Sequence, residues 1–420
     1  MKTKNWFRLL ALLLVFGMIA AACGSDDDAD STEADTEEEA STDDAADDGA
    51  ADEAEDEDAT EDEDAMEDED AMEDEEMASG HNLADVCPSP LVIQTDWFAE
   101  SEHGALYELI GDGYTVDADT LTTSGPGQVG GEPLGIDIEV RMGGPAIGFA
   151  APRVQMYTDD SIHLGYTTTD SQATAWDDLP LVAVISPLEI NPQIIMWDAD
   201  EYPDIETLAD VGEAGITINV FAGGGFSDVF AAQGLWSADQ VDPSYDGSPA
   251  RFIAEGNIAQ QGFASAEPFN YEFVFEDYGK APAFQLLHDA GFQVYSQTIG
   301  VKPDQLEEMR PCLEQFVPIV QQSVVNFAND PARANAVIVD AVETVDSFWV
   351  YTPELAEWSV AKQVELGLVG NGPDGTIGNM EADRIQKVLD DLRIAGIEIP
   401  DDLTAEDMFT NEFIDDSIGL

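Results

Sequence analysis

Short apolar runs rich in β-branched residues alternate with helix-like patterns through the middle of this chain. Strands separated by helices indicate an α/β fold with mostly parallel sheets. After residue 292 four long segments show helical spacing with few strand signals, so we expect a helical C-terminal part. The expected strands are 91–95, 136–142, 162–167, 181–186, 193–197, 216–221, 251–254 and 262–264, and the expected helices are 304–328, 331–346, 353–368 and 379–394.

Two segments of this pattern can carry the chain between two lobes. The run at 181–185 is a candidate crossing, and a return near 293–299 is the natural second one. Two lobes joined by two crossings form a hinge, and ligands of open α/β sheets bind beyond the carboxyl ends of strands. We therefore predict a ligand cleft between two lobes. Lobe 1 is expected to comprise 81–180 and 290–420, and lobe 2 to comprise 181–289.

Residues 1–22 have the layout of an export signal. Basic residues precede an apolar run at 9–19 that is too short to span a bilayer, and three alanines then lead to Cys23. A cysteine at this place resembles the lipobox of bacterial lipoproteins, in which the thiol receives a diacylglyceryl group and becomes the first residue of the mature protein. The resemblance implies an extracytoplasmic protein, anchored by lipid to the outer face of a bacterial cell membrane. The alternative is an ordinary secretory signal.

Residues 24–80 form an acidic segment built mainly from Asp, Glu, Ala, Ser and Thr, with 31 acidic residues and no Lys or Arg. Such a segment cannot bury enough apolar area to offset the entropy of ordering it. We expect 23–80 to be the acylated cysteine followed by a disordered, solvated tether. A specific partner of the tether, such as calcium or a cationic surface, is the alternative.

The acidity extends into the folded part, since the whole chain has 89 acidic and 14 basic residues and a formal net charge of −75. Nucleic acid is excluded as a partner, because a polyanion is repelled and no basic patch exists. A simple anionic ligand is disfavoured unless an arginine faces it. High ionic strength screens the self-repulsion of so acidic a protein, so we infer a salty habitat.

Two cysteines remain once Cys23 is assigned to the lipid. Thiols in an oxidising compartment usually pair, so we predict a disulfide between Cys87 and Cys312. The alternative is two buried, reduced cysteines.

One motif suggests a ligand class. The first expected strand ends in Asp96-Trp97, and His103 and Tyr107 lie four residues apart on one face of the following helix. An aromatic wall with a ring nitrogen and a phenol suits a flat heteroaromatic ligand. Read alone, Trp97 and Tyr107 are equally well core aromatics, and His103 is a residue of the helix surface.

The same spacing resembles the periplasmic binding proteins for pyrimidine precursors of thiamine, in the nitrate, sulfonate, taurine and thiamine-precursor family of ABC importers. The chain departs from that family at Ala99-Glu100, where the family has Pro-Asn. The resemblance implies a two-lobe periplasmic binding protein of type II. It implies a monomer that delivers a small heteroaromatic nutrient, thiamine precursor-like or riboflavin-like, to ABC permease subunits, without a metal or cofactor.

Three other classes of function compete with this interpretation. A binding protein for nitrate, sulfonate or taurine needs Arg153 or Arg251 in the cleft. A structural lipoprotein needs no cleft. An enzyme resembling the pyrimidine synthases is disfavoured, because the chain has neither their cysteine-rich motif nor a nucleophile elbow nor a metal-binding histidine pair.

Three further segments fit ligand contacts at the ends of expected strands. Hydroxyls in 166–170 lie at a helix N-terminus, and the glycine-rich turn at 223–226 lets backbone amides approach a ligand. Glu267 can accept hydrogen bonds from an exocyclic amine, and Tyr271 can close over the ligand. A helix cap, a plain tight turn and surface packing are the structural alternatives. The predicted ligand-binding residues are Trp97, His103, Tyr107, Tyr166, Thr167, Thr168, Asp170, Gly223, Gly224, Gly225, Phe226, Glu267 and Tyr271.

Overall fold

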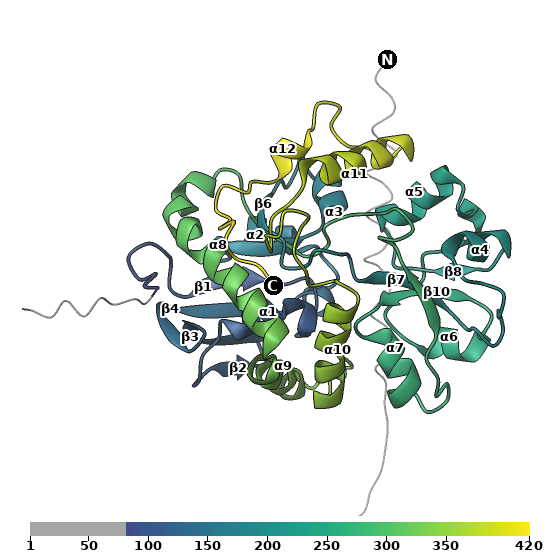
Figure 1. The fold of residues 1–420 in the computed structure, drawn as a ribbon, viewed down its shortest axis with the longest axis horizontal. Helices are drawn as coiled ribbons and strands as arrows, with labels where there is room; N and C mark the ends of the chain where they lie inside the picture. The colour runs from purple at the N-terminus through teal and green to yellow at the C-terminus, as the bar shows by residue number, and fades with distance from the viewer. Residues whose placement is uncertain (1–80) are drawn as a thin grey trace, which may run out of the picture. The chain divides into compact units, whose positions relative to one another are not determined.

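Two mixed sheets organise residues 81–420, the part of the chain that the computed structural model describes (Figure 1). Sheet 1 has the strand order β2-β3-β4-β1-β5-β12-β6, and sheet 2 has the order β11-β7-β10-β8-β9. We call the part built on sheet 1 lobe 1 and the part built on sheet 2 lobe 2. The strands are β1 (Leu91–Gln94), β2 (Thr115–Asp117), β3 (Thr122–Val129), β4 (Glu132–Arg141), β5 (Leu164–Thr167), β6 (Val182–Ile185), β7 (Gln193–Trp197), β8 (Ile218–Asn219), β9 (Val241–Asp242), β10 (Ala259–Phe263), β11 (Ala283–Leu286) and β12 (Thr298–Val301).

The strand directions differ from the mostly parallel arrangement expected from the sequence. In sheet 1, β1 is parallel to β4 and β5, and in sheet 2, β8 is parallel to β9 and β10. The remaining pairings are antiparallel. Strands β2, β3 and β4 follow one another through short turns, which forces neighbours to run in opposite directions. The fold is therefore α/β with mixed sheets.

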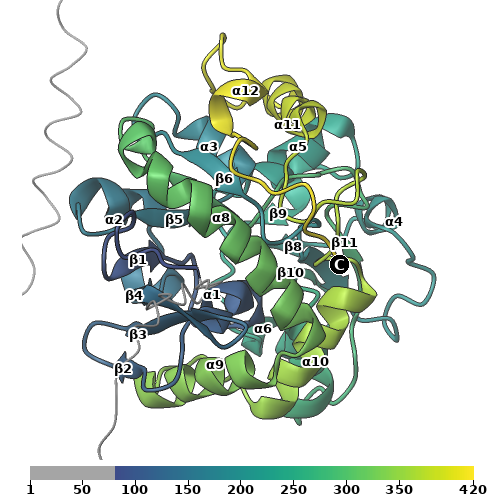
Figure 2. The ribbon, with the colours of Figure 1, turned by 60° about the vertical axis from the view of Figure 1, so that its left-hand side comes forward.

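The long C-terminal helices agree with the sequence prediction. They are α8 (Leu306–Asn329), α9 (Ala332–Val345), α10 (Pro353–Glu365) and α11 (Ala382–Ile394). Figures 1 and 2 show α8 crossing lobe 1, where its apolar face contributes to the core beneath sheet 1. Burial of one apolar face stabilises such a helix more than its propensity does.

One predicted strand is wrong, because 251–254 lies in helix α6 (Ala250–Glu255). The helix ends at Gly256, whose φ of 64° is left-handed. The apolar residues Phe252 and Ile253 of this short helix resemble a strand pattern in sequence, and runs this short do not distinguish the two structures. The other helical segments are η1 (Ser101–His103), α1 (Gly104–Glu108), η2 (Gly144–Ile147), α2 (Pro152–Thr158), α3 (Thr169–Thr174), α4 (Leu208–Glu213), α5 (Gly225–Gln233), η3 (Ala238–Gln240), α7 (Glu267–Phe269), η4 (Asn270–Val274) and α12 (Ala405–Met408).

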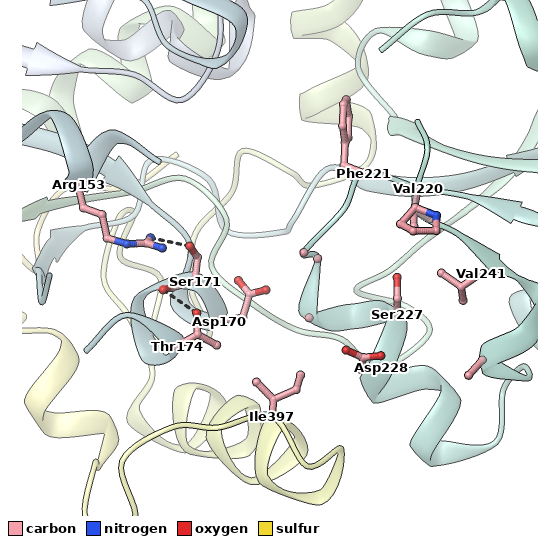
Figure 3. Close-up of a pocket in the computed structure, with 15 residues that line it drawn as sticks. Arg153, Asp170, Ser171, Thr174, Val220, Phe221, Ser227, Asp228, Val241 and Ile397 are labelled. Carbon is pink, nitrogen blue, oxygen red and sulfur yellow. Dashed lines mark hydrogen bonds between the residues drawn. The ribbon is translucent and has the colours of Figure 1, made fainter. Parts of the chain in front are cut away.

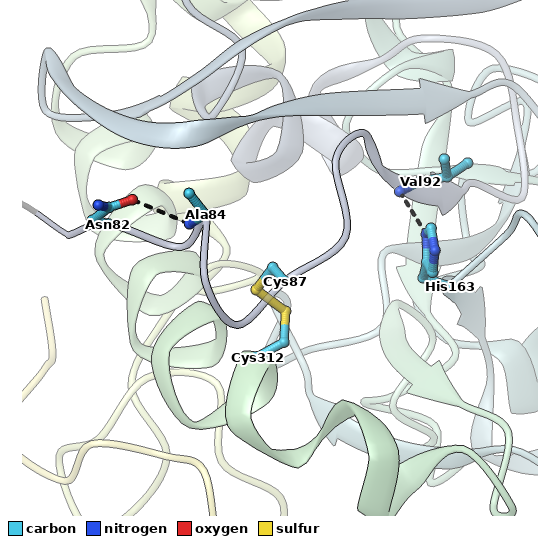
Figure 4. The surroundings of a disulfide bond; sticks show 6 residues. All are labelled: Asn82, Ala84, Cys87, Val92, His163 and Cys312. Atoms are coloured by element: carbon cyan, nitrogen blue, oxygen red, sulfur yellow. Dashed lines mark hydrogen bonds between the residues drawn. A yellow bond between two sulfur atoms is a disulfide. The ribbon is translucent and has the colours of Figure 1, made fainter.

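The predicted disulfide is present in the structure, where Cys87 and Cys312 are bonded across 225 residues of sequence (Figure 4). Cys87 precedes β1, and Cys312 lies on the buried face of α8. The bond therefore ties the entry segment of lobe 1 to its longest helix. The signal segment, Cys23 and the acidic tether lie outside the described residues.

The chain passes between the lobes twice, from β6 to β7 and from β11 to β12. The segment 181–185, expected as a crossing, contains β6 itself, which pairs with β12 inside sheet 1. The first crossing therefore follows β6, at 186–192, and the second occupies 287–297. The domain limits predicted from the sequence remain a proposal.

Helix α11 lies where both lobes meet it. It packs against α3 of lobe 1 and α5 of lobe 2, as Figure 1 also shows near the top of the view. Its apolar residues join the core that covers sheet 2. Within 81–420 no helix is both long enough and apolar enough to cross a bilayer.

Candidate ligand-binding cleft

A small cavity lies where the two lobes face each other, and we call it the inner cavity. Lobe 1 contributes the loop after β1, and lobe 2 contributes the ends of β8 and β10. The carboxyl ends of these strands meet at the cleft, as expected for a ligand site in an α/β protein. Its volume is about 70 Å³, and its main lining side chains are Asp96, Trp97, Glu100, Phe221, Tyr245, Glu267, Gln297 and Trp349.

Aromatic rings from both lobes form the walls of the inner cavity. The Trp97 ring lies 6.1 Å from Phe221 of lobe 2 and 5.9 Å from Trp349, measured between centroids. Phe221 in turn contacts Tyr245 at 4.6 Å. The Trp97 indole is only partly buried, so it is available to a ligand. Such a box of rings provides flat, polarisable surfaces for a planar molecule.

A larger outer cavity of about 580 Å³ adjoins the inner one and shares Tyr245, Glu267 and Trp349 with it. Two aromatic side chains on its rim are more than half exposed, Phe149 at 54% and Phe348 at 62%. The inner cavity can hold one small chemical group, and the outer cavity has the size of an ordinary ligand site.

Three carboxyl groups face the inner cavity, namely Asp96, Glu100 and Glu267. Burial raises the pKa of Glu100 well above its usual value, and the nearby carboxylates raise it further. Burial also raises the pKa of Glu267 to about 7, although the Phe263 amide donates a hydrogen bond to its Oε2 at 2.6 Å. No Lys, Arg or His belongs to the described lining of the inner cavity. The site is therefore acidic and aromatic.

Asp96 is oriented by two neighbours. His103 Nε2 donates to Asp96 Oδ1 at 2.8 Å, and Gln297 Nε2 donates to Asp96 Oδ2 at 3.3 Å. His103 is fully buried and packs edge-on against Tyr166. His103 thus acts as a positioning residue behind the cavity, since it does not line it.

A hydrogen bond joins the lobes directly beside the cavity. Ser265 of lobe 2 donates from Oγ to Glu102 Oε1 of lobe 1, and both residues are buried. Burial raises the pKa of Glu102, and the Ser265 hydroxyl opposes that effect. The contact links the two lobes across the cleft.

The predicted residues divide into three groups. Trp97 and Glu267 line the inner cavity, and Tyr271 lines the outer cavity while its ring belongs to the core of lobe 2. Tyr107 and Tyr166 are completely buried in the core of lobe 1 and line no described cavity, so the expected flanking of the ligand by Tyr107 does not occur here. Tyr107 lies on the face of α1 that is turned toward the core, and its ring packs there.

Four of the remaining predicted residues line a third cavity, which we call the side cavity, of about 430 Å³ (Figure 3). Asp170 and the glycine turn at 223–225 line it, together with Arg153. Thr168 is the N-cap of α3 and accepts a hydrogen bond from the Ser171 amide. Thr167 is buried in sheet 1, and Phe226 lies in the core of lobe 2.

Sequence reasoning missed several side chains of the inner cavity. Phe221 ends the expected strand 216–221 and Glu100 lies in the Ala99-Glu100 departure from the family, but neither belongs to the predicted ligand-binding residues. Tyr245, Gln297 and Trp349 lie in segments without a motif. Trp349 comes from the loop between α9 and α10, more than 250 residues from Trp97. The available signal was the dense aromatic run at 348–351, which is unusual for an exposed loop.

Within the described residues, no three His, Cys, Asp or Glu side chains come together as a metal site. The carboxyl groups of the inner cavity are thus not arranged as a ligand set for an ion. Organic groups remain the better match for a cavity with ring walls.

Comparisons with solved structures identify the fold. The ligand-binding component of an ABC-type import system from Staphylococcus aureus, solved with zinc bound, matches with a TM-score of 0.50 at 12% identity, covering 77% of this chain and 97% of that one. The alkanesulfonate-binding protein of Xanthomonas axonopodis bound to MOPS matches with a TM-score of 0.47 at 14% identity, covering 77% of this chain and 99% of that one. A Candida albicans gene product with the generic periplasmic binding protein fold has a TM-score of 0.47 at 14% identity, with 78% and 98% covered.

No family model matches the sequence, and no curated protein matches it. The structural neighbours named above include the ligand-binding component of an ABC-type import system, at an identity that establishes architecture alone. The match to the Staphylococcus aureus binding component and the two sheets therefore show that residues 81–420 adopt the two-lobe, type II fold of the periplasmic binding proteins.

Proposed function

We propose that this protein is the extracytoplasmic solute-binding component of an ABC importer and that it binds a small heteroaromatic nutrient. The observation that carries the proposal is an aromatic-walled cavity between the two lobes of a binding-protein fold. Ligand enters the open cleft, the rings of Trp97 and Phe221 enclose it, and the closed form is presented to the permease. A thiamine precursor or a flavin has the flat shape that such walls accept.

The proposed anchor is the acylated Cys23, with the acidic segment as a tether between membrane and lobes. Replacement of Cys23 by Ser is expected to release the protein from the membrane fraction without changing its ligand affinity. Radiolabelled fatty acid should enter the wild-type protein and not the variant. Labelling of the Cys23→Ser protein would contradict this assignment.

A thermal-shift screen of the full chain in high salt tests the ligand class, because a ligand that binds only the folded state raises the melting temperature. The screen contains vitamins, pyrimidines, sulfonates and nitrate. Heteroaromatic compounds are expected to shift the transition, and replacing Trp97 by Ala should weaken their binding without unfolding the protein. A shift caused only by small anions would overturn the proposal.

A second candidate function is the binding of a sulfonate or taurine in the side cavity. Its basis is Arg153, whose Nη1 donates to Ser171 Oγ at 2.6 Å on the wall of that cavity. Asp170 lies on the same wall and Asp228 across the cavity, so the site suits a zwitterion better than a simple anion (Figure 3). Arg251, the other candidate, is paired with Asp242 and Glu255 and lines neither the inner nor the side cavity. Replacing Arg153 by Gln is expected to abolish binding if the ligand is a sulfonate or taurine in the side cavity. The same replacement leaves binding unchanged if the ligand is a heteroaromatic compound in the inner cavity.

A further inference from the structure

The inner cavity contains a carboxyl group without a partner. Glu100 is 6% exposed, and its side chain lines the cavity. Among the described residues no group donates a hydrogen bond to its side-chain carboxyl group, and its charged neighbours are the carboxylates Asp96, Glu102 and Glu267. An ionised carboxylate in such surroundings is costly unless a positive group meets it.

No cation of the protein supplies that positive group. The described linings of the inner and outer cavities contain no Lys, Arg or His. Apart from Arg153 in the side cavity, the described basic side chains form ion pairs with carboxylates, as Arg141, Lys280 and Arg384 do. The inner and outer cavities therefore contain carboxyl groups without a base.

Gln297 provides a second, independent observation. It is 2% exposed and lines the inner cavity. Its Nε2 must face Asp96, because a carboxylate only accepts hydrogen bonds, so its Oε1 is the free atom. That Oε1 is buried and has no hydrogen-bond partner among the described residues. A buried acceptor without a donor points to a ligand that carries an N–H or O–H group.

The aromatic walls complete the pattern. Trp97, Phe221, Tyr245 and Trp349 surround the same space as the carboxyl groups. Aromatic faces attract organic cations through the ring quadrupole, and the attraction increases when water is excluded. An inorganic ion gains little from such walls and prefers several oxygen ligands in a defined geometry.

We propose that the ligand is an organic cation, a positively charged nitrogen heterocycle whose charged nitrogen lies against Glu100 in the inner cavity. Its remaining atoms extend into the outer cavity, and an N–H or O–H group of the ligand donates to Gln297 Oε1. The inference rests on the proposed function and narrows it, since neutral flavins and anionic sulfonates fall outside this class.

Isothermal titration of the full chain with two matched probes tests the charge. The probes are 1-methylnicotinamide, which is permanently positive, and nicotinamide, which has the same ring and carboxamide without the charge. Thiamine and choline are added as further cations, riboflavin as a neutral heterocycle, and Ca²⁺ and Zn²⁺ as inorganic ions. At least one heterocyclic cation should bind at least about 30-fold more tightly than the neutral compounds, a ratio typical for a desolvated charge pair.

The matched variants are Glu100→Gln and Glu357→Gln. Both remove one negative charge, but Glu357 is exposed on α10, outside the inner and outer cavities. Glu100→Gln is expected to weaken the cation that binds best by about 30-fold or more, and Glu357→Gln by less than about twofold. Glu267→Gln serves as a second variant, and melting curves of all proteins show whether each variant is folded.

The outcomes separate the two proposals. If nicotinamide or riboflavin binds as tightly as the cations, or if folded Glu100→Gln keeps full affinity, the charge inference is wrong and the importer proposal stands. If only Ca²⁺ or Zn²⁺ binds, the site takes inorganic ions and the inference is also wrong. If no heteroaromatic compound of either charge binds, the proposed function fails with it.

Discussion

The cleft of this protein holds a buried glutamate and the hinge a partly buried one, but only the hinge provides its glutamate with a base. In the hinge, Arg384 of α11 binds Glu189 of the first crossing at 3.0 Å. The same guanidinium donates to the carbonyls of Gln293 and Val294 in the second crossing and lies 3.7 Å from the Tyr295 ring centre. One side chain thus joins both crossings.

In the cleft, by contrast, Glu100 has only other acids as charged neighbours. Burial raises the pKa of both Glu100 and Glu189, but Arg384 opposes the effect at Glu189 and nothing opposes it at Glu100. The difference indicates that the glutamate of the hinge has its counter-charge within the protein. The carboxyl group of Glu100 in the cleft gains a partner only when it binds a proton or a positively charged ligand.

The largest expected effect follows from removing the arginine of the hinge ion pair. Replacing Arg384 by Leu leaves the partly buried Glu189 without its partner and two backbone carbonyls without donors, so we expect a loss of about 3 kcal/mol in the free energy of unfolding. Urea unfolding measures the loss.

Arg310→Leu is the control for that experiment. Arg310 forms exposed ion pairs with Glu307 and Glu412, which contribute roughly 0–1 kcal/mol. Equal losses for the two variants would show that Arg384 is no more than another surface pair.

The pH dependence of the free energy of unfolding tests the carboxyl groups of the inner cavity. The pKa of Glu267 is raised from 4.5 to about 7, so the stability linked to its proton is fully present below pH ~4.5 and is lost as the pH rises through about 7. Asp96, Glu100, Glu102 and Tyr245 surround it without a base. We expect the ligand-free protein to lose about 2 kcal/mol from this group between pH 5 and pH 8.

Glu189 also has a pKa raised to about 7, so the difference between wild type and Glu267→Gln isolates the part due to the cleft. Urea unfolding at a series of pH values supplies both curves. Identical slopes for the two proteins would remove Glu267 from the explanation, whereas a bound cation should flatten the wild-type curve.

Single neutral substitutions should have opposite signs in the two regions. Glu100→Gln is expected to stabilise the ligand-free protein at pH 8 by about 1 kcal/mol, because on folding the unpartnered carboxyl group must either bury its charge or take up a proton. Glu189→Gln is expected to destabilise it by a similar or larger amount, since Arg384 loses its counter-charge. Melting temperatures of the two variants, measured side by side, test this expectation. Shifts of the same sign would contradict the difference between the cleft and the hinge.

The sequence predicted the fold better than the site, for physical reasons that individual residues illustrate. Local patterns identified the strands at 91–95 and 193–197 and all four long C-terminal helices. The spacing of apolar residues along the chain indicates which face of each element is buried. The pairing of Cys87 with Cys312 followed from the small number of thiols. The hairpin of β3 and β4 was only half recognised, since glycine and proline interrupt the apolar pattern of β3.

The cleft depends on contacts that no local pattern contains. Trp349 reaches Trp97 only because α8 and α9 return the chain to the start of lobe 1, and Gln297 reaches Asp96 only through the second crossing. Tyr107 shared a helical face with His103 in sequence, but that face turns toward the core rather than the cleft. Spacing thus located the segments, whereas only the fold determines which side chains are exposed to a ligand.

The smallest expected effect concerns the aromatic wall alone. Gly144 has a φ of 58°, and a Cβ at that position lies 2.4 Å from the Trp97 ring. Gly144→Ala must therefore displace the indole and adopt a backbone conformation that costs about 1 kcal/mol. We expect ligand affinity to fall about tenfold while the hinge is unaffected, and the stability loss to comprise the backbone strain and the ring contacts that the displaced indole loses.

Gly148→Ala is the matched control, because Gly148 has a φ of 65° in the same loop but no neighbouring atom within 4 Å of its Cβ position. Both variants carry the same backbone strain, and only Gly144→Ala moves the Trp97 ring. Tryptophan fluorescence should change for Gly144→Ala alone. If the two variants bind ligand equally well, the position of the indole is not what the cleft requires, and the carboxyl groups rather than the rings distinguish this cleft from the hinge.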